Sequence, residues 1–232
     1  MLRRVVPLVS ATLLLAACSS SSTPKTTVIA PSDALAKLAA QGAAASYSAT
    51  YAFHQVSPDT TATVQVWRAE PSLRVDVVVG GTTATLIMTS TGSYSCSISG
   101  AKKSCLQVAG AGAPVPAPFD VAPANLFSAD LRALAAESPA YDVRAAPTRP
   151  AAAQVPAAQC FDVSSTSASP SSSPSPGAAA TVPTGRYCFT PAGVLAAASY
   201  PSGNTITLTA LQSTAPSASS FTPYARPTPL PS

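Results

Sequence analysis

The side chains that could do chemistry in this sequence are five cysteines, one histidine and nine acidic residues. His54 lies in a strand-like pattern beside Phe53, so a serine, histidine and aspartate triad would have to assemble by folding alone. The acidic residues are scattered singly, which gives no local carboxylate pair for glycoside hydrolysis. The sequence contains no GxSxG, phosphate-binding-loop or HExxH motif and no cysteine–histidine metal spacing. We therefore predict no catalytic residues, no metal and no cofactor.

One cysteine, Cys18, follows Leu15-Ala16-Ala17, and this spacing resembles the bacterial lipobox. Before it come Arg3, Arg4 and an apolar run too short to span a bilayer, a pattern typical of a secretion signal. In a lipobox the thiol is acylated, with palmitate for example, and the preceding peptide bond is cut. We predict that Cys18 anchors an exported chain to the outer face of the bacterial plasma membrane. The alternative is an ordinary signal peptide with a cysteine nearby.

The other four cysteines are even in number, which in an exported chain favours disulfides over free thiols. Cys96 and Cys105 lie symmetrically about a hairpin-like turn at Gly100, so they can face each other. Cys160 and Cys188 remain as the second pair, each in a short apolar segment. A zinc site is the competing interpretation, but neither a CxxC spacing nor a nearby histidine supports it.

The composition argues against binding of a charged partner through the net charge of the protein. Charged residues make up 9% of the chain, and loss of Arg3 and Arg4 lowers the formal charge from +4 to +2. Such a small charge gives no electrostatic basis for binding nucleic acid. We expect a neutral, hydroxyl-rich surface and a domain anchored by acyl chains alone.

Hydrophobic periodicity predicts an α+β domain built on an antiparallel meander. A helix begins at Ser32 or Asp33, which would cap it, and runs to about residue 45; a second helix covers 122–137. The predicted strands are 46–56, 60–69, 72–79, 82–90, 93–98, 103–108, 140–146, 157–164, 185–190, 193–200 and 204–211.

Alternation in these strands predicts a strongly curved sheet, a half-open β-barrel, with the helices on its concave apolar face. In 72–79, for example, Leu73, Val75, Val77 and Val79 point to one side and Arg74 and Asp76 to the other. An incompletely filled face of this kind could hold an acyl chain. The candidate lining residues are Tyr51, Phe53, Val64, Val66, Val75, Val77, Leu86, Met88, Leu126 and Leu131. The alternative is that the same side chains form a filled core. Trp67 is interpreted as a packing anchor, either on the outer face or under the helix.

The domain organisation follows from shifts in composition. We predict a signal peptide over 1–17, a flexible lipid-anchored tether over 18–31, one domain over 32–224 and a flexible tail over 225–232. A Ser/Pro-rich loop over 164–183 interrupts a hairpin of that domain.

This order of lipobox, tether, helix, meander, covering helix and further strands resembles the LolA/LppX/LprG-like lipoproteins of cell-envelope lipid handling. Locally similar stretches are 46–51, 67–76 and 185–195. The resemblance implies a half-open barrel with an apolar cavity for acyl chains and no catalysis. The Ser/Pro loop and the second disulfide depart from the family pattern.

These observations lead to two functional hypotheses. The first is a membrane-anchored lipoprotein that binds or transfers a lipid-like or glycolipid envelope molecule without catalysis. The second is an envelope scaffold or sensor with a filled core that binds a protein partner, whose identity the sequence does not give. A cavity of several hundred Å³ between sheet and helix would favour the first, and a solid core the second.

Overall fold

The structure is a computed structural model, and it describes residues 29–116, 119, 123–136, 141–152, 154–166 and 184–229. The predicted signal peptide, Cys18 and nearly all of the predicted tether lie outside these residues, as does most of the Ser/Pro-rich loop. Among the described residues, no helix has both the length and the hydropathy needed to cross a bilayer.

The described elements are mostly strands. In chain order they are α1 (Pro31–Ala44), β1 (Tyr47–Gln55), β2 (Thr60–Ala69), β3 (Ser72–Val79), β4 (Thr82–Thr89), β5 (Gly92–Ser99), β6 (Lys102–Gly110), the π-helix η2 (Leu126–Asp130), α2 (Leu131–Ala135), β7 (Tyr141–Arg149), β8 (Ala158–Ser165), β9 (Gly185–Phe189), β10 (Leu195–Ser199), β11 (Thr205–Gln212), the 3-10 helix η3 (Ala218–Phe221) and β12 (Thr228–Pro229).

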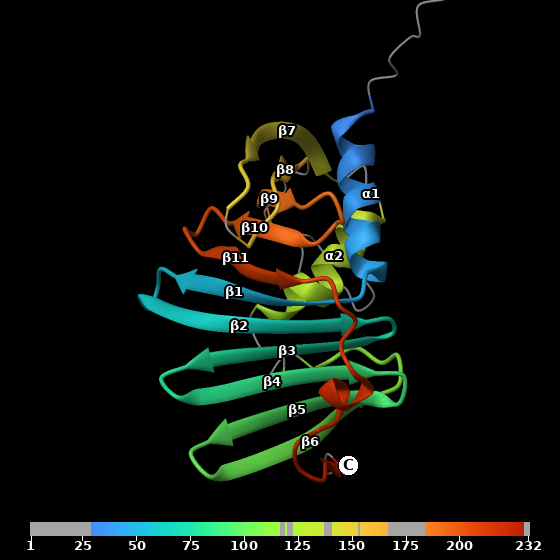
Figure 1. Cartoon of the computed structure of the whole chain (residues 1–232), viewed down its shortest axis with the longest axis vertical. Helices are drawn as coiled ribbons and strands as arrows, with labels where there is room; N and C mark the ends of the chain where they lie inside the picture. Colours follow the sequence, from blue (N-terminus) through green and yellow to red (C-terminus); the bar gives the residue numbers. More distant parts are fainter. Residues whose placement is uncertain are drawn as a thin grey trace, which may run out of the picture.

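All the described strands belong to one curved sheet, ordered β12-β6-β5-β4-β3-β2-β1-β11-β10-β9-β8-β7 (Figure 1). Every neighbouring pair is antiparallel except β12 with β6, which run parallel. The two ends of the sheet do not meet, so the architecture is the predicted α+β half-open barrel. The second half of the chain joins the first through the pairing of β11 with β1, far apart in sequence.

The alternation of β3 shows how the sequence gives the sheet two faces. Leu73, Val75 and Val77 are buried in the main core, and Arg74 points to the opposite face. Val79 departs from this prediction because it ends the strand and is 41% exposed. Asp76 lies on the same face as Arg74, as predicted, but it is buried there rather than exposed to solvent.

The helices cover the face that carries Leu73 and Val75. α1 starts at Pro31, whose fixed φ suits the first helical turn, and the predicted cap by Ser32 or Asp33 is wrong because neither side chain caps the helix. The second helix is shorter than predicted and contains the π-helical turn η2. Leu126 and Leu131, five residues apart in the sequence, are both buried, and the wider turn allows residues at this spacing to share a face.

α1 approaches the β9–β10 turn at two glycines. A Cβ on Gly42 would lie 2.0 Å from the carbonyl oxygen of Gly193, and Gly193 itself has a φ of +78°. Only residues without a side chain allow this separation, because a Cβ at that distance would overlap the oxygen. The glycine pair therefore fixes how closely α1 lies against the second half of the sheet.

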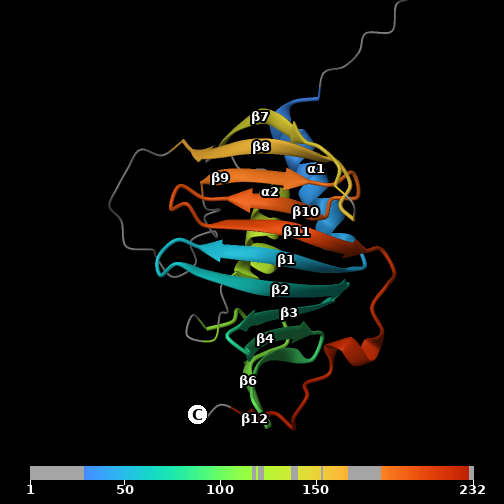
Figure 2. The same ribbon diagram turned by 60° about the vertical axis from the view of Figure 1, so that its left-hand side comes forward.

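The C-terminal residues 213–229, called the strap from here on, run back over the face opposite to the helices. The strap leaves β11, passes across β3 and β4 through η3, and ends where β12 pairs with β6 (Figures 1 and 2). Thr228 and Pro229 fall in the predicted flexible tail, yet the structure places them beside Leu106 and Gln107. No pattern in the sequence indicates this pairing, since two residues carry no strand periodicity.

Candidate functional site

The four cysteines other than Cys18 form the two predicted disulfides. Cys96 and Cys105 are directly opposed in β5 and β6, with an S–S distance of 2.12 Å. Cys160 and Cys188 are opposed in β8 and β9, with an S–S distance of 2.03 Å. Each bond therefore joins neighbouring strands of the half of the sheet in which it lies.

The single histidine lies on the β1–β2 hairpin. Its Nδ1 is 3.7 Å from Oδ1 of Asp59, and the two side chains are 46% and 87% exposed. When His54 is protonated this is a surface ion pair, which contributes little to stability. Among the described residues no three His, Cys, Asp or Glu side chains group closely enough to hold a metal ion.

The ten residues predicted to line a ligand cavity meet under the helices. Nine are buried, and Met88 is half-buried against the same cluster. Tyr51, Val64, Val66 and Val75 have no accessible surface. A side chain without accessible surface borders no void large enough for a water molecule, so these four contact other side chains on every side. A ligand-lining role for the ten residues stays a prediction.

Phe127 of η2 explains how the concave face is filled. Its ring lies 4.9 Å from that of Tyr51, at an interplanar angle of 52°, and both residues are fully buried. Leu126 and Leu131 complete the same layer. Side chains of the chain itself therefore occupy the space that an acyl chain would need beside Tyr51.

A buried cation, Arg68, links the sheet to both helices, and the sequence did not reveal it. Arg68 is only 7% exposed. One guanidinium nitrogen donates to the carbonyl of Ala43 at 3.1 Å, and the other donates to the carbonyl of Phe127. Ala43 lies in the last turn of α1, where carbonyls lack helical partners and the helix dipole is negative. Arg68 thus supplies a hydrogen-bond donor and a positive charge at the C-terminal end of α1.

Two tyrosines lie next to Arg68 in the core. The hydroxyls of Tyr47 and Tyr51 and the Nε of Arg68 are buried without a hydrogen-bond partner. Burial raises the pKa of Tyr47, and the nearby charge of Arg68 offsets part of this. Burial also raises the pKa of Tyr51, with a smaller contribution from Tyr47. Both phenols are therefore neutral at neutral pH.

An open cleft of about 490 Å³ lies at the border of this core. Its walls are the C-terminal half of α1, the turn between β2 and β3, and α2. Its lining includes Ala40 and Ala44 of α1 and Met88 of β4, together with Glu70 of the β2–β3 turn and Arg132 of α2. The cleft thus combines a small-residue apolar wall with one negative and one positive side chain.

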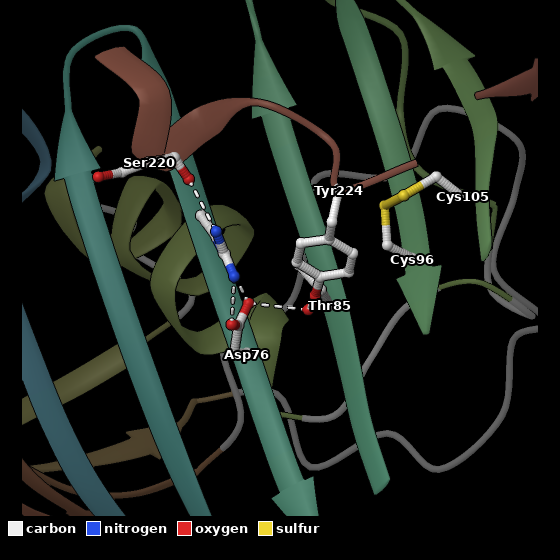
Figure 3. Close-up of polar contacts among 7 residues, drawn as sticks. Asp76, Thr85, Cys96, Cys105, Ser220 and Tyr224 are labelled. Carbon is white, nitrogen blue, oxygen red and sulfur yellow. Dashed lines mark hydrogen bonds and ion pairs between the residues drawn. A yellow bond between two sulfur atoms is a disulfide. The ribbon is translucent and has the colours of Figure 1, made fainter. Parts of the chain in front are cut away.

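The opposite face of the sheet carries a compact polar network under the strap (Figure 3). Arg74 donates to both carboxylate oxygens of Asp76, at 2.8 and 2.6 Å. It also donates to the carbonyl of Ser220 in η3, at 3.1 Å. Thr85 donates to Asp76 at 2.8 Å and contacts the hydroxyl of Tyr224.

Two aromatic rings, those of Trp67 and Tyr224, lie close to the Arg74 guanidinium. Its central carbon lies 4.8 Å from the ring centre of Trp67 and 5.0 Å from that of Tyr224. Burial alone would lower the pKa of Arg74, but the hydrogen bonds and charge of Asp76 outweigh it and raise the pKa. Trp67 is thus on the outer face, where it packs against the arginine that binds the strap.

Comparison with known proteins identifies structures with a similar fold but assigns no family. No family model matches the chain, and no curated protein matches it. The crystal structure of MucB matches with a TM-score of 0.53 and 16% identity, over 83% of this chain and 62% of MucB. A Pseudomonas aeruginosa MucA/MucB complex matches with a TM-score of 0.49 and 16% identity, over 83% and 60% of the two chains. The crystal structure of MucB in complex with MucA(peri) matches with a TM-score of 0.43 and 14% identity, over 83% of this chain and 59% of that chain.

The likeness is one of fold. The chain spans about three fifths of the length of the MucB chains that it matches. The resemblance to LolA/LppX/LprG-like lipoproteins is corrected by these findings, since no family model matches and the similar structures are of MucB. Element order and local pattern misled here because many unrelated functions share one curved-sheet architecture.

Proposed function

We propose that this chain is a non-catalytic, protein-binding module of the cell envelope, held at the outer face of the plasma membrane by a lipid on Cys18. The observation that carries the proposal is the filled core around Tyr51. Tyr51, Val64, Val66 and Val75 have no accessible surface, and the ring of Phe127 packs against that of Tyr51 from the helical side. A domain that has filled its interior recognises other molecules through its surface.

The cleft between α1, the β2–β3 turn and α2 is the proposed contact surface on the helical side. It is open to solvent, and its apolar wall is made of alanines that let a partner backbone approach closely. Glu70 and Arg132 supply opposite charges that can orient a peptide segment. Arg68 lies beneath and fixes the two helices that form the walls.

The similarity to MucB supports a protein partner. MucB shares the fold, and it has been crystallised in complexes with MucA. For the present chain the partner is inferred as a protein segment of unknown identity.

The experiment that tests the proposal compares two positions on the full-length, membrane-anchored protein. A photo-crosslinking residue replaces Arg132 at the cleft, and a matched control replaces Arg144, which is 79% exposed on β7. We expect one defined protein to cross-link in cells from position 132 and not from 144. The purified form of that protein should bind saturably to the wild-type chain.

Native mass spectrometry of the detergent-extracted chain provides the second measurement. We expect no stoichiometric non-covalent lipid besides the acyl groups on Cys18. A stoichiometric bound lipid together with equal cross-linking at both positions would instead favour the lipid carrier and refute the proposal.

A further inference from the structure

We infer that the outer face of β3–β5 is a peptide-binding surface for a partner segment bearing a phenylalanine and a tyrosine three residues apart, and that the strap occupies this surface in cis. The inference rests on the proposed function only in taking the partner to be a protein. Its test does not involve the cleft, so either proposal can fail alone.

The first argument is that the strap contacts the sheet as a bound peptide would. Phe221 is 8% exposed and packs on Ile87 and the Cys96–Cys105 disulfide. Three residues later, Tyr224 covers the Arg74 guanidinium and reaches Thr85. Directly before the first anchor, the carbonyl of Ser220 accepts a hydrogen bond from Arg74 (Figure 3). Two aromatic anchors and one backbone contact are a typical peptide-recognition pattern.

The second argument is that the rest of the strap is lightly held. Of residues 213–229, only Phe221 is buried. β12 pairs with β6 at two positions, and both of its residues are exposed. The strap also begins with the exposed residues 213–215, which connect it to β11. A segment fixed mainly at two side chains can open while the remainder of the domain stays folded.

The third argument is that the surface is complete without the strap. The pairings of β3 with β4 and of β4 with β5 run unbroken through Asp76, Thr85 and Cys96. The Arg74–Asp76 pair also comes from a single strand, so it does not need the strap to form. Opening the strap would therefore expose a preformed site and free the edge of β6 for a partner strand.

The probe is a fluorescein-labelled peptide with the sequence of residues 217–229, and its control has alanine in place of Phe221 and Tyr224. Binding is measured by fluorescence anisotropy on the full chain, as wild type and as the F221A/Y224A variant, whose strap is weakened while its sheet is unchanged. A tethered segment competes at an effective concentration in the millimolar range. We therefore expect the probe to bind the variant at least tenfold tighter than wild type, and the control peptide to bind neither.

Hydrogen exchange of the wild-type chain tests strap opening independently of any variant. We expect amides of residues 218–225 to exchange at least a hundredfold faster than those of β3 and β4. Exchange of the strap only together with β3 and β4, or equal binding of the probe to both proteins, would overturn the inference and make the strap a permanent part of the fold. A dimer that exchanges straps as the concentration rises would assign the surface to a second copy and overturn it as well.

Discussion

The guanidinium of Arg68 in β2 donates a 3.1 Å hydrogen bond to the carbonyl of Ala43 in the last turn of α1. A residue of the sheet thus caps the C-terminal end of the helix that covers the sheet. Because the same side chain also reaches the carbonyl of Phe127, one buried cation positions both helical segments and the cleft between them.

Replacing Arg68 with methionine should destabilise the domain by about 2 kcal/mol, because the buried carbonyl of Phe127 and the part-buried carbonyl of Ala43 lose their donor. Urea unfolding followed by circular dichroism would measure this change. R144A is the matched control, since Arg144 is 79% exposed and pairs with Asp142 at the surface. Equal stability of R68M and wild type would show that Arg68 does not hold the helices.

Alanine at Gly42 should destabilise the domain by about 1–3 kcal/mol, because its Cβ would overlap the carbonyl of Gly193 and force α1 outward. G110A is the control, since a Cβ there meets no atom within 4 Å. Thermal unfolding of the two variants would give the comparison. A similar loss in both would attribute the effect to the backbone change rather than to the helix contact.

The Arg74–Asp76 pair should show strong coupling in a double-mutant cycle. Both side chains are largely buried, at 17% and 7% exposure, so removing Asp76 alone leaves a poorly solvated cation. We expect a coupling free energy of about 1–3 kcal/mol from the R74A, D76A and double variants in urea unfolding. The Arg144–Asp142 pair, which also joins residues two positions apart in one strand, should give less than about 1 kcal/mol because it is exposed.

Alkaline pH should unfold the domain through its tyrosines. Burial is the main cause of the raised pKa of Tyr47, Tyr51, Tyr187, Tyr200 and Tyr224. The unfolded chain then loses these protons at lower pH than the folded chain, so their contribution to stability is full below pH 10.0 and falls as the pH rises above it. Phenolate absorbance should therefore rise together with loss of circular dichroism. Ionisation of these tyrosines before unfolding would contradict the burial.

Serine at Cys18 should release the chain from the membrane, because no other lipid attachment site is predicted. Cell fractionation and intact mass of the mature chain would measure this, with the wild-type mass increased by its acyl groups. Membrane association that persists in C18S would disprove the lipobox interpretation.

The strands β1 to β11 were predictable because alternation along the chain marks them and Gly or Pro turns bound many of them. β3 shows this most clearly, with Leu73 and Val75 alternating with Arg74. The disulfide between Cys96 and Cys105 was predictable for the same reason, since a hairpin register places those two residues opposite each other. The strap was missed because residues 213–229 have no period and take their conformation from the sheet beneath them.

The sequence by itself determined the curved antiparallel sheet and the pairing of the four cysteines other than Cys18, because local spacing specifies each of these. The tertiary structure alone decided which space is filled. Phe127 against Tyr51, Arg68 beneath α1 and Tyr224 over Arg74 are contacts between segments far apart in the chain, and a hydrophobic pattern is the same for a packed core as for an empty cavity.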